Sequence, residues 1–275
     1  MPVKNIDIKN KLKKLVGKDN LILTGTGNKA ILYALRAMKR IGKKKLVIQD
    51  QGGWITYTQY AKKLKFGIVV LRTDYGILKP SELIKNIDED SVLLYTSMAG
   101  YHAVQPCEEI AKICKKKDCI VINDASGSIG RDEAKSGDIV ICSMGEGKPI
   151  DYGKGGFLAY NDDIKDVFEK LEMHTLELDD ENREKLYKKI LGLDRRLEIL
   201  TILHNKVKDG LKEMKIIHKD KEGINVIVKF NSNEEKQKIT SYCRKNDLEF
   251  EECPRDIRVK EDAISIEIKR KITEI

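Results

Sequence analysis

The sequence offers little with which to build disulfide bridges or a metal centre. It has six cysteines, yet none of them form a Cys-x-x-Cys pair, and no histidine accompanies them at the spacing of a metal site. Two of the six, Cys119 and Cys142, belong to short apolar segments that are typical of buried strands. We therefore expect reduced, mostly buried thiols, no bound metal and a cytoplasmic location. The remaining cysteines are Cys107, Cys114, Cys243 and Cys253.

Long apolar runs and repeated segments are also missing. No apolar run approaches the ~20 residues that a membrane-spanning helix needs. The amino terminus is polar and charged, unlike a secretory signal peptide. These absences predict a soluble intracellular protein that does not associate with membranes.

Acidic residues are the minority among the charged side chains. The chain has 52 Lys and Arg residues against 44 Asp and Glu residues, which gives a formal net charge of +8 at pH 7. The lysines are spread along the whole chain. Clusters such as 43–45 and 115–117 follow predicted helices, where the helix dipole favours cations. This distribution argues against nucleic acid as the partner.

The first part of the chain alternates between short apolar strands and helical segments. This alternation predicts an α/β fold with a mostly parallel sheet and helices on both faces. After Asn161 the alternation stops, and a long helical stretch, about 181–214, precedes a shorter mixture of strands and a helix. At 275 residues the chain can hold one large domain and a small one. We predict a large α/β domain over 1–162, a helical connection over 163–214 and a small α+β lobe over 215–275.

The segment 137–160 is the most informative part of the sequence. It contains two apolar strands, 139–142 and 157–160, which are joined by a glycine-bearing loop that includes Lys148. A lysine in such a loop is presented to a pocket, and imine formation with a carbonyl compound is the chemistry that its amine does best. The alternative is an ordinary surface lysine in a lysine-rich chain.

Polar or aromatic side chains follow several other predicted strands. Asp124 lies just beyond an apolar strand, where a carboxylate is costly unless it is paired, although it could also cap a turn. Trp54, the only tryptophan, follows another strand beside two glycines. Ligands of parallel sheets bind outside the carboxyl ends of the strands. The coincidence of Thr26, Trp54, Asp124, Ser143 and Lys148 at such ends therefore predicts a single site.

Residues 21–31 combine a strand, a glycine-rich turn and the start of a helix. The turn contains Gly25, Thr26, Gly27 and Asn28, and helical spacing follows at once. Free backbone amides at a helix amino terminus and the positive end of the helix dipole favour an anion such as phosphate. An ordinary strand–helix turn would use the same residues.

Together these segments resemble the fold-type-I pyridoxal-phosphate (PLP) enzymes of the aspartate aminotransferase superfamily, most closely the DegT/StrS-type sugar aminotransferases. The family's lysine loop reads serine, four residues, lysine, then four residues before glycine-x-glycine-glycine, which matches Ser143, Lys148 and 153–156. Its Asp-Ala-Ala signature with a nearby glycine resembles 124–127. Its early Ser-Gly-Thr resembles 26–28. The resemblance covers about residues 20–160.

The resemblance implies a three-layer sandwich with a seven-stranded sheet, the PLP-dependent transferase fold, and a homodimer. It implies that Lys148 forms the internal aldimine with pyridoxal 5'-phosphate, that Asp124 keeps the pyridine nitrogen protonated, and that Trp54 stacks on the ring. Ser143 and the backbone amides of Gly27 and Asn28 would grip the phosphate. The implied cofactor-binding residues are Lys148, Asp124, Ser143, Thr26, Gly27, Asn28, Trp54 and Ser126.

An aminotransferase that passes an amino group from a small-molecule donor to a keto acceptor is the leading interpretation. Met144, Gly145 and Lys154 depart from the family's pattern and the second half is short, so the donor and acceptor stay open. The alternatives are a PLP-dependent lyase or desulfurase, a tRNA-linked aminoacyl-modifying enzyme, or a non-catalytic binding protein on the same fold. The presence of both Lys148 and Asp124 favours an enzyme, because a scaffold needs neither.

Overall fold

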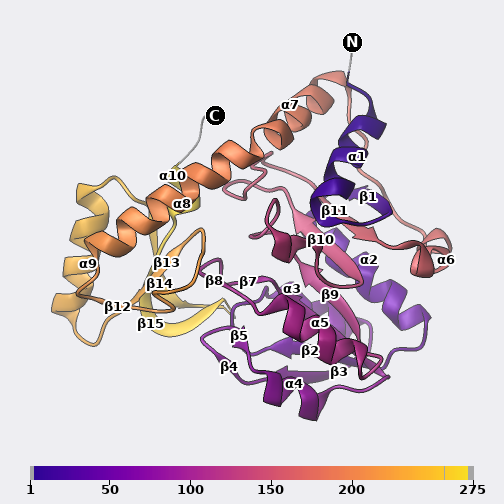
Figure 1. The fold of residues 1–275 in the computed structure, drawn as a ribbon, viewed down its shortest axis with the longest axis horizontal. Helices are drawn as coiled ribbons and strands as arrows, with labels where there is room; N and C mark the ends of the chain where they lie inside the picture. Colours follow the sequence, from indigo (N-terminus) through magenta and orange to yellow (C-terminus); the bar gives the residue numbers. More distant parts are fainter. Residues whose placement is uncertain (1–2, 257, 272–275) are drawn as a thin grey trace.

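The computed structural model describes residues 3–256 and 258–271. A seven-stranded sheet forms its larger part, in the strand order β1-β11-β10-β9-β6-β2-β3 (Figure 1). All strands are parallel except β11, which is antiparallel to both of its neighbours. The predicted mostly parallel α/β sheet is confirmed. The strands are β1 (Asn20–Thr24), β2 (Lys45–Gln49), β3 (Gly67–Leu71), β6 (Ser91–Thr96), β9 (Ile120–Asp124), β10 (Ile139–Ser143) and β11 (Gly156–Tyr160).

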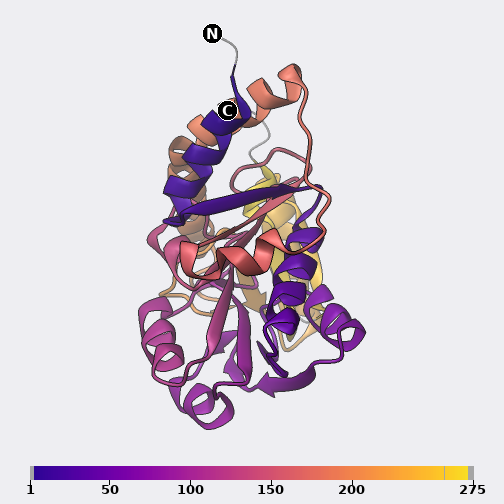
Figure 2. The same cartoon turned by 90° about the vertical axis from the view of Figure 1, so that its right-hand side faces the viewer.

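Helices cover both faces of this sheet, as the side view in Figure 2 shows. In β10, Ile139 and Ile141 pack toward α2, whereas Val140 and Cys142 pack toward α1, because successive side chains of a strand point to opposite faces. One face is covered by α2 (Gly27–Arg40), α3 (Thr56–Lys63) and α6 (Lys165–Glu169). The other face is covered by α1 (Asn5–Val16), α4 (Pro80–Asn86), α5 (Cys107–Lys115) and α7 (Asp180–Leu191).

The helical stretch predicted over 181–214 is divided into two helices. These are α7 and α8 (Leu193–Gly210), and they meet at Gly192, where the backbone N–H still bonds to carbonyls of the last turn of α7. Helix α8 runs diagonally from the sheet to the second part of the molecule (Figure 1). Its first turns place Leu193 and Leu197 in the core beside the sheet, and its later turns place Leu200 and Val207 in the second core.

The second part is built on a four-stranded antiparallel sheet in the order β12-β13-β15-β14. It contains β12 (Lys215–Ile216), β13 (Val226–Lys229), α9 (Asn233–Lys245), β14 (Phe250–Arg255), β15 (Val259–Ile266) and α10 (Ile268–Lys271). Within the described ranges, no helix has both the length and the apolar character required to cross a membrane. The remaining short elements are β4 (Thr73–Asp74), β5 (Ile77–Leu78), β7 (Met98–Ala99), β8 (Ala103–Val104), η1 (Asp132–Lys135) and η2 (Asp162–Ile164).

Candidate active site

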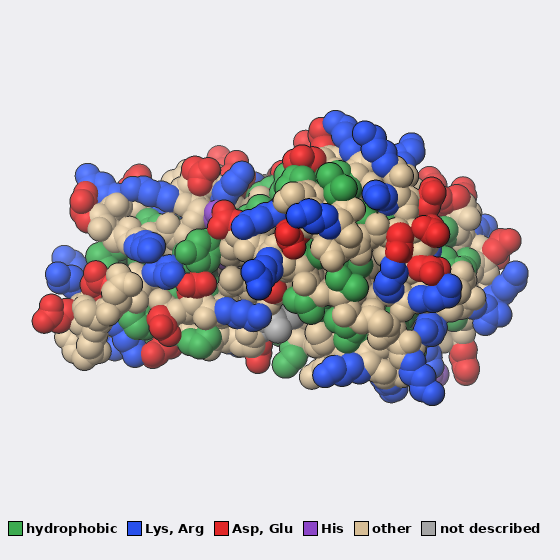
Figure 3. All heavy atoms as spheres, turned by 90° about the horizontal axis from the view of Figure 1, so that it is seen from below, with side chains coloured by type: hydrophobic (Ala, Val, Ile, Leu, Met, Phe, Trp, Pro, Cys, Tyr) green, Lys and Arg blue, Asp and Glu red, His purple; other side chains and the backbone are tan. Residues whose placement is uncertain are grey.

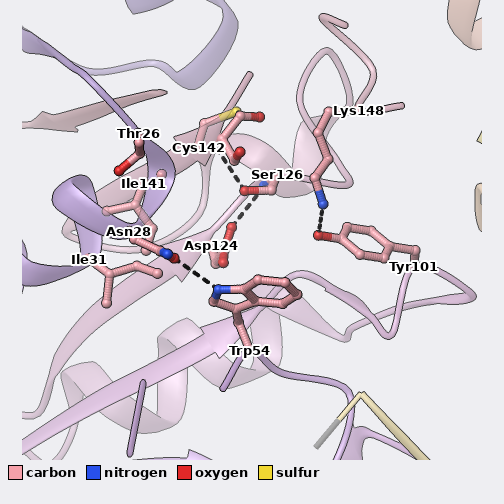
Figure 4. Close-up of a pocket in the computed structure, with 12 residues that line it drawn as sticks. Thr26, Asn28, Ile31, Trp54, Tyr101, Asp124, Ser126, Ile141, Cys142 and Lys148 are labelled. Atoms are coloured by element: carbon pink, nitrogen blue, oxygen red, sulfur yellow. Dashed lines mark hydrogen bonds between the residues drawn. The ribbon is translucent and has the colours of Figure 1, made fainter. Parts of the chain in front are cut away.

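A cavity of about 180 Å³ opens at the carboxyl ends of the parallel strands (Figure 4). The structure brings all eight predicted cofactor-binding residues together in its lining: Thr26, Gly27, Asn28, Trp54, Asp124, Ser126, Ser143 and Lys148. Four further residues complete the lining, namely Ile31, Tyr101, Ile141 and Cys142. Segments far apart in the sequence therefore meet at one place because their strands are parallel neighbours in the sheet.

The first wall of the cavity is the amino terminus of α2. The Thr26 hydroxyl caps this helix by accepting a hydrogen bond from the Lys29 backbone N–H at 3.1 Å. A Cβ atom at Gly27 would come within 2.7 Å of the Ser143 Cβ, so only a glycine allows the helix to approach β10 this closely. The first backbone N–H groups of α2 and the Ser143 side chain consequently lie together at one end of the cavity.

Two serines tie the ends of neighbouring strands together. The Ser143 backbone N–H donates to Ser126 Oγ at 2.8 Å, and the Ser126 backbone N–H donates to Asp124 Oδ1 at 3.0 Å. Both contacts involve buried or half-buried groups, so they fix the ends of β9 and β10 relative to each other. Ser126 therefore lines the cavity and also holds Asp124 and Ser143 in position.

Asp124 is a buried carboxylate whose two oxygens both accept hydrogen bonds. Oδ1 accepts the hydrogen bond from the Ser126 backbone N–H, and Oδ2 accepts a hydrogen bond from the Tyr57 hydroxyl at 2.6 Å. The aspartate is only 8% exposed, and such a charge is stable inside a protein when donors of this kind surround it.

Trp54 forms another wall of the cavity, an aromatic one, and has a partner on each of two sides. Its indole N–H donates to Asn28 Oδ1 at 2.9 Å, which links the turn after β2 to the start of α2. On the other side the guanidinium of Arg258, from the second part of the molecule, lies 5.6 Å from the ring centroid.

Lys148 reaches the cavity from the loop between β10 and β11. Its amine contacts the hydroxyl of Tyr101 and lies 4.0 Å from the centroid of that ring, and Figure 4 shows the two side chains pointing toward each other. Burial lowers the pKa of Lys148 from 10.5 to about 8, assisted by the positive charge of Arg258 and opposed by Asp124 and Glu267. An appreciable minority of this amine, about a tenth to a fifth, is therefore neutral near physiological pH, far more than for an ordinary lysine.

The rate at which Lys148 attacks a carbonyl compound should depend on pH accordingly. Only the neutral amine attacks, so with a pKa of about 8 the rate should rise about tenfold between pH 7 and pH 9 and then level off. An ordinary lysine would show a rate that is still climbing at pH 9. Stopped-flow absorbance after mixing with an aromatic aldehyde measures this profile, and a steady rise through pH 10 would contradict it.

Three residues near the site are missing from the sequence-based prediction. Tyr101 lies in the turn between β7 and β8, and no sequence pattern marks it. The neighbouring His102 is buried against the ring of His218 and does not line the cavity. Tyr57 belongs to a helix whose apolar spacing suggests only a core position. Arg258 lies between β14 and β15 of the other sheet, so no local pattern connects it with Lys148.

The structure was compared with known proteins. No curated protein sequence matches the chain. Solved structures do match: 3-amino-5-hydroxybenzoic acid synthase has a TM-score of 0.74 at 14% identity, covering 96% of this chain and 85% of that chain. A putative sugar aminotransferase from Streptococcus pneumoniae, in its apo form, has a TM-score of 0.74 at 11% identity, covering 99% of this chain and 88% of that one.

A third similar structure is serine palmitoyltransferase from S. paucimobilis with a bound PLP–myriocin aldimine, with a TM-score of 0.73 at 16% identity over 95% of this chain and 70% of that one. At these identities the likeness establishes a shared fold. The model of the MJ1341 family C-terminal domain matches residues 192–274. The model of the DegT/DnrJ/EryC1/StrS aminotransferase family matches residues 4–206, and the chain accordingly belongs to that family.

Proposed function

We propose that this protein is a PLP-dependent aminotransferase that moves an amino group from a small amino donor to a keto acceptor, with Lys148 as its catalytic residue. The observation that carries this proposal is the meeting of the Lys148 amine, the Asp124 carboxylate and the amino terminus of α2 in one cavity. Family membership and the PLP-containing structural relative support the choice of cofactor.

The donor set of the cavity fits PLP. At one end, the α2 amino terminus, without an acidic residue in its described first turn, and the Ser143 hydroxyl suit a phosphate. A buried carboxylate, Asp124, suits a protonated ring nitrogen, and the Trp54 indole offers a flat surface for a ring. The Lys148 amine, whose lowered pKa makes it partly neutral, suits the aldehyde.

When bound, PLP supplies an electron-accepting ring that allows a bond at the carbon bearing the amino group to break. The protein's own residues provide the rest. Lys148 Nζ, with its lowered pKa, can take a proton from that carbon and return one. Tyr101 holds the amine at the cavity through its hydroxyl and its ring. Asp124 supplies the negative charge that attracts a protonated ring nitrogen.

A desulfurase is less well supported, because it needs a reactive thiol near the site. Cys142 does line the cavity, but it lies in β10, and burial together with the charge of Asp124 raises the pKa of its thiol well above its ordinary value. All six cysteines are free and buried. A thiol that stays protonated in a rigid strand is poorly suited to accept sulfur from a substrate.

A nucleic-acid substrate is also less well supported. In the basic cluster 43–45, Lys44 forms an ion pair with Asp90 at 3.0 Å and Lys45 pairs with Asp88, so acidic neighbours offset the charge. Figure 3 shows Lys and Arg side chains interspersed with Asp and Glu on the face that it presents. The proposed partners are therefore a small amino donor, a keto acceptor and a second copy of the chain, which light scattering of the purified protein would detect.

The test is a titration of the purified protein with PLP, followed by amino donors. We expect an absorbance band from bound PLP, trapping of that PLP on Lys148 by borohydride, and conversion to pyridoxamine phosphate by at least one amino acid. A keto acid should then restore the original band. Failure of the folded protein to bind PLP would refute the proposal. A donor that yields product while the cofactor remains PLP would identify a lyase instead.

A further inference from the structure

Tyr57 holds the carboxylate of Asp124 from outside the described cavity lining, and this position suggests a role in binding a ligand. It lies in the first turn of α3, and its side chain is fully buried. Its hydroxyl donates to Asp124 Oδ2 at 2.6 Å, a short distance typical of a hydroxyl bound to a carboxylate. Tyr57 is outside the described cavity lining, but its hydroxyl reaches Asp124, which does line the cavity.

The phenol of Tyr57 acts as a donor at every physiological pH. Burial raises the pKa of Tyr57 well above its ordinary value, and the negative charge of Asp124 raises it further. The hydroxyl therefore keeps its proton and points it at the carboxylate.

The segment that carries Tyr57 is itself anchored to the cavity. The Tyr57 backbone N–H donates to the Trp54 carbonyl at 3.1 Å, and the Trp54 indole N–H donates to Asn28 Oδ1 at 2.9 Å. The Thr56 hydroxyl bonds to the same Asn28 oxygen at 3.3 Å. One short turn thus carries both Trp54, which lines the cavity, and Tyr57, which donates to Asp124. Hydrogen bonds to Asn28 fix this turn relative to the start of α2.

We propose that Tyr57 is a positioning residue that fixes the Asp124 carboxylate for contact with the ring nitrogen of PLP. This inference rests on the proposed function, because it needs PLP in the cavity. Without the Tyr57 hydroxyl, Asp124 loses one of its two donors, and its Oδ2 is no longer held in place. The contact that suffers is specifically the one between the carboxylate and a protonated nitrogen.

The competing explanation is that Tyr57 is only a core residue, since it also packs in the cluster beneath α2 and α3. The two explanations differ in what they predict for different ligands. A general loss of packing would weaken every molecule that occupies the cavity. Loss of a positioning contact would weaken only molecules that carry the ring nitrogen.

The experiment compares two ligands on three proteins. The ligands are PLP and a carbocyclic analogue in which a C–H group replaces the ring nitrogen, and binding of each is followed by absorbance or fluorescence titration. The proteins are the unsubstituted chain, Tyr57→Phe, and the matched control Tyr60→Phe, which changes a half-buried tyrosine of the same helix outside the described cavity lining. Circular dichroism checks that each variant is folded.

We expect Tyr57→Phe to weaken PLP binding about tenfold, the size of effect expected for loss of a donor to a buried charge. The affinity of Tyr57→Phe for the carbocyclic analogue should stay within about twofold of that of the unsubstituted protein. Tyr60→Phe should leave the affinity for both ligands unchanged. Equal weakening of both ligands by Tyr57→Phe, or no weakening of either, would overturn the inference while leaving the proposed function intact. A folded, unsubstituted protein that binds no PLP would overturn both.

Discussion

Alanine in place of Lys148 is expected to abolish borohydride trapping of PLP and to lower the rate of amino transfer on the order of 10³-fold or more. Of the 12 described residues that line the cavity, Lys148 is the one that carries a side-chain amine. The substitution therefore removes both the proposed covalent attachment point and the group proposed to move the proton. The α2 end of the cavity, where we propose that the phosphate binds, remains, so PLP should still bind without a covalent bond.

The matched control for this substitution is Lys154→Ala. Lys154 belongs to the same loop between β10 and β11, but it is exposed and lies 5.7 Å from the centroid of the Tyr152 ring, outside the described cavity lining. We expect its replacement to leave trapping and turnover nearly unchanged. Mass spectrometry of borohydride-treated, digested protein locates the attachment site. PLP found on another lysine, or turnover that survives Lys148→Ala, would contradict the assignment of Lys148.

Much of the cavity lining could be predicted from the sequence because the relevant rule is local. Each of Thr26, Trp54, Asp124 and Ser143 ends or follows a short apolar strand, and the carboxyl ends of parallel strands meet at one edge of the sheet. Once the alternation of strands and helices establishes a parallel sheet, residues at strand ends are brought together without further information.

The positions that could not be predicted depend on contacts between elements. Tyr57 reaches Asp124 only because α3 packs on the sheet face that its side chain enters, and its spacing in the sequence is that of any core residue. Arg258 approaches Trp54 and Tyr101 because the second sheet lies against the cavity, and neither period nor composition reveals that placement. The division of the predicted helix 181–214 at Gly192 is similar, since helical spacing continues across it.

The largest feature absent from the sequence-based prediction is a buried charged cluster beside Tyr101. Glu267 is 0% exposed and accepts hydrogen bonds from Ser265 Oγ at 2.8 Å and from Asn225 Nδ2 at 2.9 Å. It forms an ion pair with Lys269 through Oε2, and the guanidinium of Arg258 lies 3.9 Å from its other oxygen, Oε1. A single carboxylate therefore compensates two buried cations next to the cavity.

Replacing Glu267 with glutamine should lower the free energy of unfolding by about 3 kcal/mol, because it leaves buried cations without a countercharge while changing the side chain's size very little. The double variant Glu267→Gln/Lys269→Met should recover about half of this loss or more, since one uncompensated cation is then removed. The exposed ion pair of Glu108 and Lys112, at 3.8 Å, provides the control, and Glu108→Gln should cost less than about 0.5 kcal/mol.

The loss caused by Glu267→Gln should also depend on pH in a defined direction. Burial, opposed by Glu267, holds the pKa of Lys269 at about 7 against an ordinary value of 10.5. Between these values the folded chain binds fewer protons than the unfolded chain, so this lysine makes stability rise with pH. Without Glu267 the pKa of Lys269 falls further below its unfolded value. The resulting loss of stability is largest at low pH, where the unfolded chain binds the proton and the folded variant gives it up. The destabilisation measured by urea unfolding should therefore be larger at pH 6 than at pH 9. A loss that is equal at both would show that Lys269 has no part in it.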